Sequence, residues 1–171
     1  MRNLQPCDAE AVFRYRSDPE VSRFQNWEPK SLQEVQSFIS EQADVSVGTP
    51  GQWCQFGLYL NAGGHLIGDC GIHVLQADPR QAEVGITLSP AYQGRGYATE
   101  ALTGLLGYLF NDLAKHRVFA SVDPRNEASL ALLTRVGMRR EAHFRQSLWF
   151  KGGWADDVVF GMLSSEFQGG S

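Results

Sequence analysis

The residues best suited to chemistry form a glycine-rich turn, Gln93-Gly94-Arg95-Gly96-Tyr97-Ala98, between an extended apolar segment and a helical pattern. Residues 82–90 have the composition of a strand that ends in a turn, and residues 99–113 have helical spacing. A strand-to-helix turn directs several backbone N–H groups and the positive end of a helix dipole toward one point, which suits a phosphate or pyrophosphate. The same glycines also suit an ordinary loop, so the turn alone leaves two interpretations open.

The composition indicates one domain. The chain has 171 residues, 43% of them hydrophobic, which supports one well-buried core but not two. Its formal net charge of -4 disfavours nucleic-acid binding, which requires a basic field. The cysteines Cys7, Cys54 and Cys70 are scattered and lie at no metal-ligand spacing with the four histidines, so we expect free thiols and no metal. We find no apolar signal segment or bilayer-spanning stretch, and expect a cytoplasmic protein with no membrane partner.

The periodicity predicts an α+β domain around a mixed sheet. Two helices come first, one N-capped by Asp8 and stopped at Asp18-Pro19, the other opened by a Ser31…Glu34 capping box. A meander of three strands follows, expected at 52–60, 65–75 and 82–88. We then expect a helix at 99–113, a strand at 117–122, a helix at 126–136 and a hairpin with strands at 138–150 and 154–163. We expect the domain to cover residues 1–167, and residues 168–171 to form a flexible tail.

Several blocks of the chain resemble the GNAT superfamily of N-acetyltransferases. The pattern Gln93-x-x-Gly96-x-Ala98, after a strand that carries Glu83, resembles the acyl-CoA pyrophosphate loop of that superfamily. Asn126-x-x-Ser129 followed by Gly137-Met138 resembles a block of its Rim-type branch, which acetylates ribosomal-protein N-termini and assorted small amines. Residues 8–21 and 154–158 resemble the opening and closing segments of that branch, so the similarity covers almost the full length.

The resemblance implies a GNAT-like fold: a mixed, mostly antiparallel sheet of about six to seven strands flanked by about four helices. The first edge strand should be short or missing, because the chain begins only a few residues before Leu4. The resemblance also implies acetyl-CoA as co-substrate, with no metal, and a monomer or homodimer that acts on an amine acceptor.

The same resemblance implies where acetyl-CoA binds. The pyrophosphate would accept hydrogen bonds from backbone N–H groups of the turn, with charge added by Arg95, although that side chain also suits a solvated loop. Strand 84–88 would splay from strand 117–122 and open a slot for the pantetheine arm, and a free N–H near Leu88 would stabilise the thioester oxyanion. The expected cofactor contacts are Ile86, Leu88, Gln93, Gly94, Arg95, Gly96, Tyr97, Ala98, Thr99, Asn126 and Ser129.

Glu83 is the expected general base, because a carboxylate on the strand beside the acyl group is otherwise costly to bury. The alternative is that Glu83 only pairs with an arginine such as Arg80. His73 is a second candidate for the base, although a lone strand histidine is more often structural.

Ser129 would help to protonate the departing thiolate, and Asn126 would cap its helix and touch the pantetheine. Two departures from the family pattern bear on this assignment. Leu133 occupies the position of a frequent tyrosine acid, and residues 146–149 lack the glutamate that Rim-type enzymes often carry.

The acceptor groove is expected at Phe24, Trp27 and His73, because the first helix–loop–helix segment covers the acceptor in this family. An aromatic wall favours an acceptor with a flat or apolar part, or a cation. A protein N-terminus, an antibiotic amine and a polyamine all remain open.

Two rival functions compete with catalysis. One is a catalytically weak acyl-CoA-binding sensor or interaction module with the same fold. The other is a mononucleotide-binding α/β protein, which the antiparallel meander before the turn disfavours.

Overall fold

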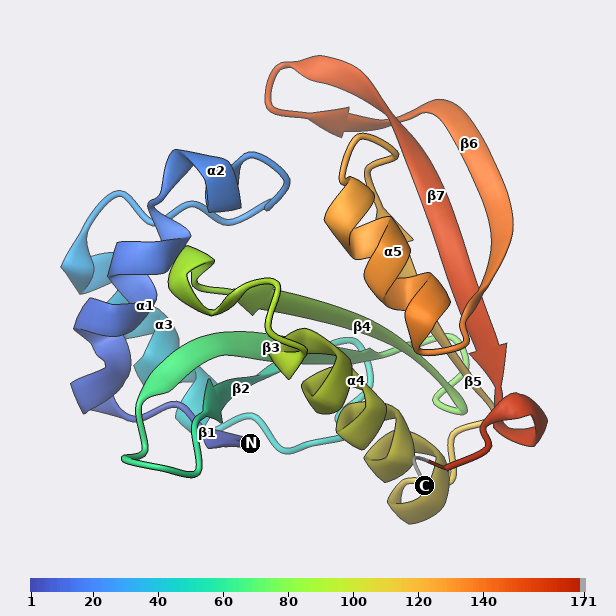
Figure 1. The fold of residues 1–171 in the computed structure, drawn as a ribbon, viewed down its shortest axis with the longest axis horizontal. Helices are drawn as coiled ribbons and strands as arrows, with labels where there is room; N and C mark the ends of the chain where they lie inside the picture. Colours follow the sequence, from blue (N-terminus) through green and yellow to red (C-terminus); the bar gives the residue numbers. More distant parts are fainter. Residues whose placement is uncertain (170–171) are drawn as a thin grey trace.

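Seven strands form one sheet in the computed structural model, which describes residues 1–169 (Figure 1). The spatial order of the strands is β1-β2-β3-β4-β5-β7-β6, and only β4 and β5 are parallel neighbours. The strands are β1 (Arg2–Asn3), β2 (Trp53–Tyr59), β3 (Leu66–Val74), β4 (Gln81–Leu88), β5 (Arg117–Val122), β6 (Arg139–Phe150) and β7 (Gly153–Leu163).

Five α-helices flank this sheet on its two faces. They are α1 (Ala9–Arg16), α2 (Pro19–Ser22), α3 (Leu32–Ala43), α4 (Tyr97–Gly107) and α5 (Glu127–Arg135). In Figure 1, α1 and α3 lie together at the left, and α4 crosses in front of the sheet. Among the described residues, none of these helices has the length and apolar content needed to cross a bilayer.

Side chains alternate between the two faces of the sheet along each strand, and a different pair of helices packs on each face. The even-numbered positions of β3 and β4, such as Ile72 and Val84, are buried with residues of α4 and α5 in the main core. The odd-numbered position Asp69 faces the opposite side, where α1 and α3 pack in a smaller cluster around Val12 and Val35. The sheet therefore has an apolar face under α4 and α5, and a more polar face toward α1.

A buried carboxylate, that of Asp69 on β3, fastens α1 to this polar face. Its Oδ2 accepts hydrogen bonds from Tyr15 OH and from Arg16 Nε, the latter at 3.0 Å. Its Oδ1 accepts from Arg16 Nη2 and, at 2.6 Å, from Gln55 Nε2 on β2. The Asp69 side chain is only 2% exposed, and these four bonds satisfy it in the way that a buried charge requires.

The expected α+β class, the order of elements and the short first edge strand are confirmed. The strand expected at 117–122 has those bounds in the structure. The helix expected over 99–113 instead begins at Tyr97, and its α-helical part ends at Gly107, where a π-helical turn (Tyr108–Asp112) continues it. Gly170 and Ser171 lie outside the described residues, so the flexible tail expected at 168–171 stays a prediction.

The prediction that Asp8 caps the first helix by its side chain is wrong. Asp8 stands at the N-cap, but its carboxylate accepts from Gln5 N at 2.8 Å and from Tyr59 OH at 2.6 Å. A short 3-10 turn over Pro6–Asp8 points the carboxylate back along the chain, away from the helix N–H groups.

The Ser31 cap of α3 is confirmed, because Ser31 Oγ accepts from Glu34 N at 3.2 Å. The reciprocal half of the capping box is shifted by one residue, since Glu34 Oε2 accepts from Lys30 N at 2.8 Å. The stop at Asp18-Pro19 is also a start: Asp18 caps the separate short helix α2.

We expect Asp69→Ala to lower the free energy of unfolding by about 3–5 kcal/mol, because it leaves the buried Arg16 guanidinium without its partner. Urea denaturation monitored by tryptophan fluorescence measures this change. Asp78→Ala is the control, since Asp78 pairs with the exposed side chain of Arg80 and such pairs contribute little. Equal losses in the two variants would contradict the assignment.

Candidate active site

The site begins where β4 and β5 part. The two strands pair in parallel only from Gln81–Arg117 to Glu83–Phe119, and the rest of β4 has β3 as its one neighbour in the sheet. Leu75 N donates to Gln81 O, so the odd-numbered residues of β4 exchange their backbone hydrogen bonds with β3. The N–H groups of the even-numbered residues beyond Glu83 therefore face the split between the strands. The splay expected between these strands is confirmed.

The glycine-rich turn lies at the far end of this split. Gly94 and Gly96 have φ of 71° and 85°, the left-handed region that glycine tolerates best. Gly96 is the N-cap residue of α4, so the turn presents the first N–H groups of that helix. Gln93 Nε2 donates to Leu88 O at 2.9 Å, which ties the turn to the end of β4. The side chain of Gln93 therefore braces the loop, while Arg95 is exposed.

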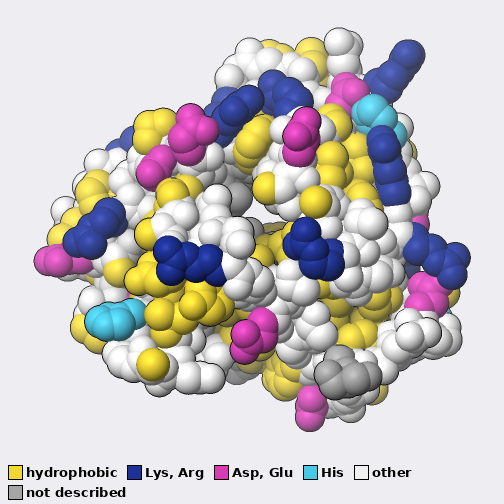
Figure 2. Space-filling view, viewed as in Figure 1, with side chains coloured by type: hydrophobic (Ala, Val, Ile, Leu, Met, Phe, Trp, Pro, Cys, Tyr) yellow, Lys and Arg dark blue, Asp and Glu magenta, His cyan; other side chains and the backbone are white. Residues whose placement is uncertain are grey.

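A cavity of about 290 Å³ extends from the split to the polar face of the sheet. Figure 2 shows the molecule hollowed near the centre of one face, with basic side chains beside hydrophobic ones around it. The cavity is lined by residues of the 24–27 loop, of β2, β4 and β5, and of α5. Among the expected site residues it is lined by Phe24, Trp27, Glu83, Ile86, Asn126 and Ser129.

Other expected residues lie outside the walls of this cavity. Leu88 and the turn residues 93–99 lie beyond its end, along the path from the split to α4. His73 does not line the cavity either, because Trp53 stacks on its ring with the centroids 5.2 Å apart. The side chain of Trp53, 42% exposed, thus forms the wall that His73 was expected to form.

Glu83 has the environment of a perturbed acid. Burial raises the pKa of its carboxyl, the neighbouring His73 lowers it, and the charge of Asp157 raises it further; the net shift is upward. His73 Nδ1 lies 3.8 Å from Glu83 Oε2, too far for a hydrogen bond, and has no hydrogen-bond partner within the described residues. The alternative that Glu83 pairs with Arg80 is wrong, because Arg80 donates to Asp78 at 2.8 and 2.9 Å.

The start of α5 forms the opposite wall. Asn126 Oδ1 accepts from Ser129 N at 3.2 Å, so the expected capping role of Asn126 is confirmed. Both residues also line the cavity. Leu133 lines it one turn further along and is 4% exposed, so this wall is apolar where the family often has a tyrosine.

The loop after α2 forms the side of the cavity where the acceptor groove was expected. Arg16 Nη1 donates to Gln25 Oε1 at 3.2 Å, and the Arg16 guanidinium lies 5.6 Å from the centroid of the Trp27 ring. The Asp69 network thus reaches this loop through Arg16 and holds an aromatic wall in place.

Sequence patterns did not reveal several residues of this region. Gln55 and Asp123 line the cavity from different elements. Asp157 accepts from Ser121 Oγ at 2.6 Å near Glu83. Arg135, at the C-terminal end of α5, donates to Thr99 Oγ1 at 3.4 Å beside the start of α4. No local signal marks these residues, because strand pairing and helix packing bring them to the site.

Comparison with known proteins agrees with this geometry. Residues 1–139 match the family model described as an acetyltransferase (GNAT) domain. An uncharacterised N-acetyltransferase, p20, of Bacillus licheniformis is 30% identical over 170 residues, covering 99% of this chain and 94% of the relative.

Solved structures give the same result. A GNAT-family acetyltransferase from Bacillus anthracis superposes with a TM-score of 0.85 at 27% identity, covering 96% of this chain and 94% of the other. RimJ of Mycobacterium smegmatis, solved in complex with CoA-disulfide, gives a TM-score of 0.83 at 25% identity, covering 98% of this chain and 82% of the other.

The parted strands, the glycine-rich turn and these similarities define the class: the chain belongs to the GNAT superfamily and is an N-acetyltransferase. The resemblance to this superfamily is confirmed.

We expect Glu83→Gln to be more stable than the wild type at neutral pH and equally stable in acid. Because the folded pKa of Glu83 is raised, its protonated form favours folding, and that contribution is lost as pH rises through the folded pKa. Glutamine resembles the protonated acid at every pH, so the difference should be absent below the unfolded pKa and grow above it. Urea unfolding measured across this pH range tests the trend. A difference that does not change with pH would contradict it.

Proposed function

We propose that this N-acetyltransferase transfers the acetyl group of acetyl-CoA directly to a primary amine, with Glu83 as general base. The observation that carries this proposal is the split between β4 and β5, which begins at Glu83 and is lined by free backbone donors. A carboxylate of raised pKa stands at one end of the split and a phosphate-binding turn at the other. That arrangement suits a long thioester whose reactive carbonyl lies near Glu83.

Binding of acetyl-CoA would use the backbone more than the side chains. The even-numbered N–H groups of β4, those of Ile86 and Leu88, suit pairing with the amide groups of the pantetheine arm. The N–H groups from Gly94 to Ala98 and the N-terminus of α4 suit the pyrophosphate. Arg95 and Arg135 add positive charge near the same helix end. RimJ was solved with a CoA compound, which supports this assignment.

The chemistry requires a deprotonated amine. A free alkylamine with a pKa near ~10 is mostly protonated at neutral pH, so a base must remove a proton before or during attack. Glu83 is suited to this because burial raises the pKa of its carboxyl toward the working range. The amine nitrogen bonds to the acyl carbon, the carbon–sulfur bond breaks, and the departing sulfur takes a proton. The expected oxyanion donor, the N–H near Leu88, lies at the turn end of the split, so an N–H that faces the split closer to Glu83 suits the oxyanion better.

The general acid in this proposal is Ser129. It lines the cavity from α5, one turn before the buried Leu133, which cannot donate a proton. His73 stays the second candidate for the base, because its Nδ1 lies 3.8 Å from Glu83 Oε2. The aromatic side chains of Phe24, Trp27 and Trp53 suit an acceptor that brings a cation or an apolar part.

The direct test is release of free CoA thiol from acetyl-CoA with a panel of primary amines. The panel contains spermidine, an arylalkylamine, an aminoglycoside and peptides that start with alanine or serine. Thiol release that depends on one class of amine supports the proposal and identifies the acceptor. CoA binding without turnover across the whole panel would favour an acyl-CoA sensor instead.

We expect Glu83→Gln to lower kcat about 100-fold, the lower range for loss of a general base, and to leave CoA affinity nearly unchanged. The reason is that the carboxylate faces the acceptor side, whereas the turn at residues 93–98 is intact in the variant. Stopped-time thiol assays and CoA calorimetry measure the two quantities. His73→Asn is the comparison. If His73→Asn loses this activity and Glu83→Gln keeps it, His73 and not Glu83 is the base.

We expect Gly96→Ala to weaken CoA binding about tenfold. An alanine in the left-handed conformation of Gly96 costs about 1–2 kcal/mol, and the turn must keep this conformation when CoA is bound. Gly104→Ala, on the exposed face of α4 with open space around an added Cβ, is the matched control. That control should bind CoA normally and gain about 0.5–1 kcal/mol of stability. Isothermal titration with CoA separates the two variants, and equal affinities would exclude the turn from the CoA site.

A further inference from the structure

The hairpin of β6 and β7 reaches well beyond the rest of the sheet. The pairing of β5 with β7 ends at Val122 and Val158, while β6 and β7 continue together to Phe150 and Gly153. In Figure 1 this part of the hairpin bends over at the top of the molecule toward α2. The turn at its end, residues 151–152, is therefore far from the core and yet close to the acceptor side.

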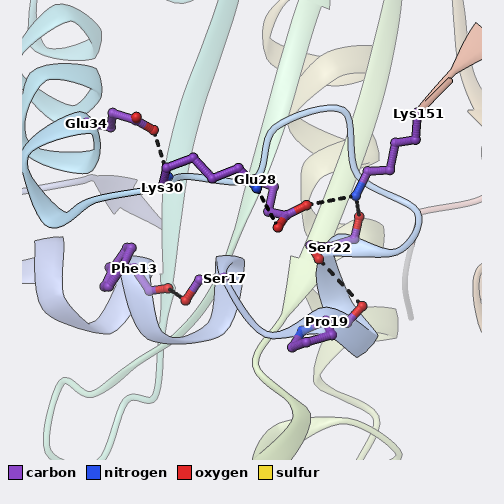
Figure 3. A network of polar contacts seen from close by, with 8 residues as sticks. All are labelled: Phe13, Ser17, Pro19, Ser22, Glu28, Lys30, Glu34 and Lys151. Atoms are coloured by element: carbon purple, nitrogen blue, oxygen red, sulfur yellow. Dashed lines mark hydrogen bonds and ion pairs between the residues drawn. The ribbon is translucent and has the colours of Figure 1, made fainter.

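Lys151 in this turn contacts the last residue of α2 and the loop after it, as Figure 3 shows. Its Nζ donates to the backbone oxygen of Ser22 at 2.8 Å and to Glu28 Oε2 at 3.0 Å. The partners lie 129 and 123 residues away in the sequence. One ammonium group thus joins the last hairpin of the chain to a loop near its beginning.

The two partners of Lys151 flank the part of the loop that lines the cavity. Ser22 precedes and Glu28 follows the cavity-lining residues 24–27. Ser22 O also accepts from Gln25 N at 2.9 Å, so the start of the loop is already folded as a turn. Because Lys151 Nζ binds residues at both ends of the loop, it restricts the conformations that the aromatic residues of the loop can adopt.

The backbone of Lys151 supplies a second, independent observation. Its φ is 46°, and Gly152 after it has φ of 85°. Two consecutive left-handed residues form the kind of hairpin turn in which asparagine or glycine is favoured at the first position. A lysine there is disfavoured by its Cβ, and such strain persists where the side chain is used.

The charges around Glu28 agree with this role. Hydrogen bonds from Lys30 and then Lys151 lower the pKa of the Glu28 carboxyl, so it is charged at neutral pH. Lys30 Nζ binds the other oxygen, Oε1, at 2.7 Å. Lys30 lies only two residues from Glu28, so its bond does not connect the loop to the hairpin.

We propose that Lys151 is a specificity-determining positioning residue, which clasps the 22–28 loop to the β6–β7 hairpin and so sets the shape of the acceptor side of the cavity. This inference rests on the proposed function in one respect, namely that the cavity beside Glu83 receives the amine. Lys151 does not line the cavity and would act through Phe24 and Trp27, which lie on the loop that it holds and do line it. With the clasp closed, the loop favours one acceptor over bulkier amines.

The test uses Lys151→Asn, which removes the ammonium and keeps a residue suited to a left-handed turn. Lys30→Ala is the matched control, because it removes the other cation from Glu28 and leaves the hairpin attached. Kinetics are measured with acetyl-CoA and with each amine of the panel described above. Hydrogen exchange of the 23–28 amides is measured on the same proteins without substrate.

For Lys151→Asn we expect the KM of the best amine to rise about three- to tenfold, because the variant loses the charge-assisted contacts of the Lys151 ammonium. The KM of acetyl-CoA and the melting temperature should not change. Exchange of the 23–28 amides should quicken, and discrimination against the bulkier amines should fall. Lys30→Ala should show none of these changes.

Unchanged acceptor KM and unchanged exchange in Lys151→Asn would overturn the proposal, as would equal effects in Lys30→Ala. The exchange experiment also separates this proposal from the proposed function. A wild-type protein that acetylates no amine refutes the function, while quicker exchange in Lys151→Asn still shows the clasp.

Discussion

The separation of β4 from β5 after Glu83 is the constraint on which the rest of the structure depends. If the two strands parted at the edge of the sheet, water could bind their free backbone groups. They part in the middle of the sheet instead, beneath α4 and α5. The N–H groups of β4 that face the split beyond Glu83 pair with no residue of β5, so the split favours a ligand that brings its own acceptors. The helices hold the split open from one side: α4 begins at its far end and α5 lines it. The site is thus an interruption in the sheet and not a depression on its surface.

The polar face of the sheet supports the wall that we propose for the amine. Asp69 fixes Arg16, and Arg16 supports Gln25 and Trp27, so a buried ion pair in α1 and β3 places the wall of the cavity. A buried pair of this kind adds little net stability when compared with apolar packing, but it specifies one geometry. Here that geometry is the distance between an aromatic loop and the carboxylate of Glu83.

The fold was largely predictable because its signals are local. Periodicity gave strand 117–122, and the glycines of residues 94–96 marked the start of a helix. Asp8 misled the prediction, since a cap depends on the direction in which a 3-10 turn points the side chain. The split between β4 and β5 and the place of Glu83 in the cavity wall were predictable. Trp53, Asp157 and Lys151 were not, because strand register and a long hairpin bring them there across gaps that no local pattern spans.

The side of the cavity that we propose for the acceptor combines distant parts of the chain, since the turn at residues 151–152 contacts the end of α2 and the loop after it. Synthesis on the ribosome delivers these parts far apart in time, because a chain grows by only about 5–20 residues per second. The strand β4 and the glycine-rich turn emerge well before the hairpin. Under the proposed function, a nascent chain therefore has the segments for the donor before it can shape the place for the acceptor, and its selectivity depends on its last strands.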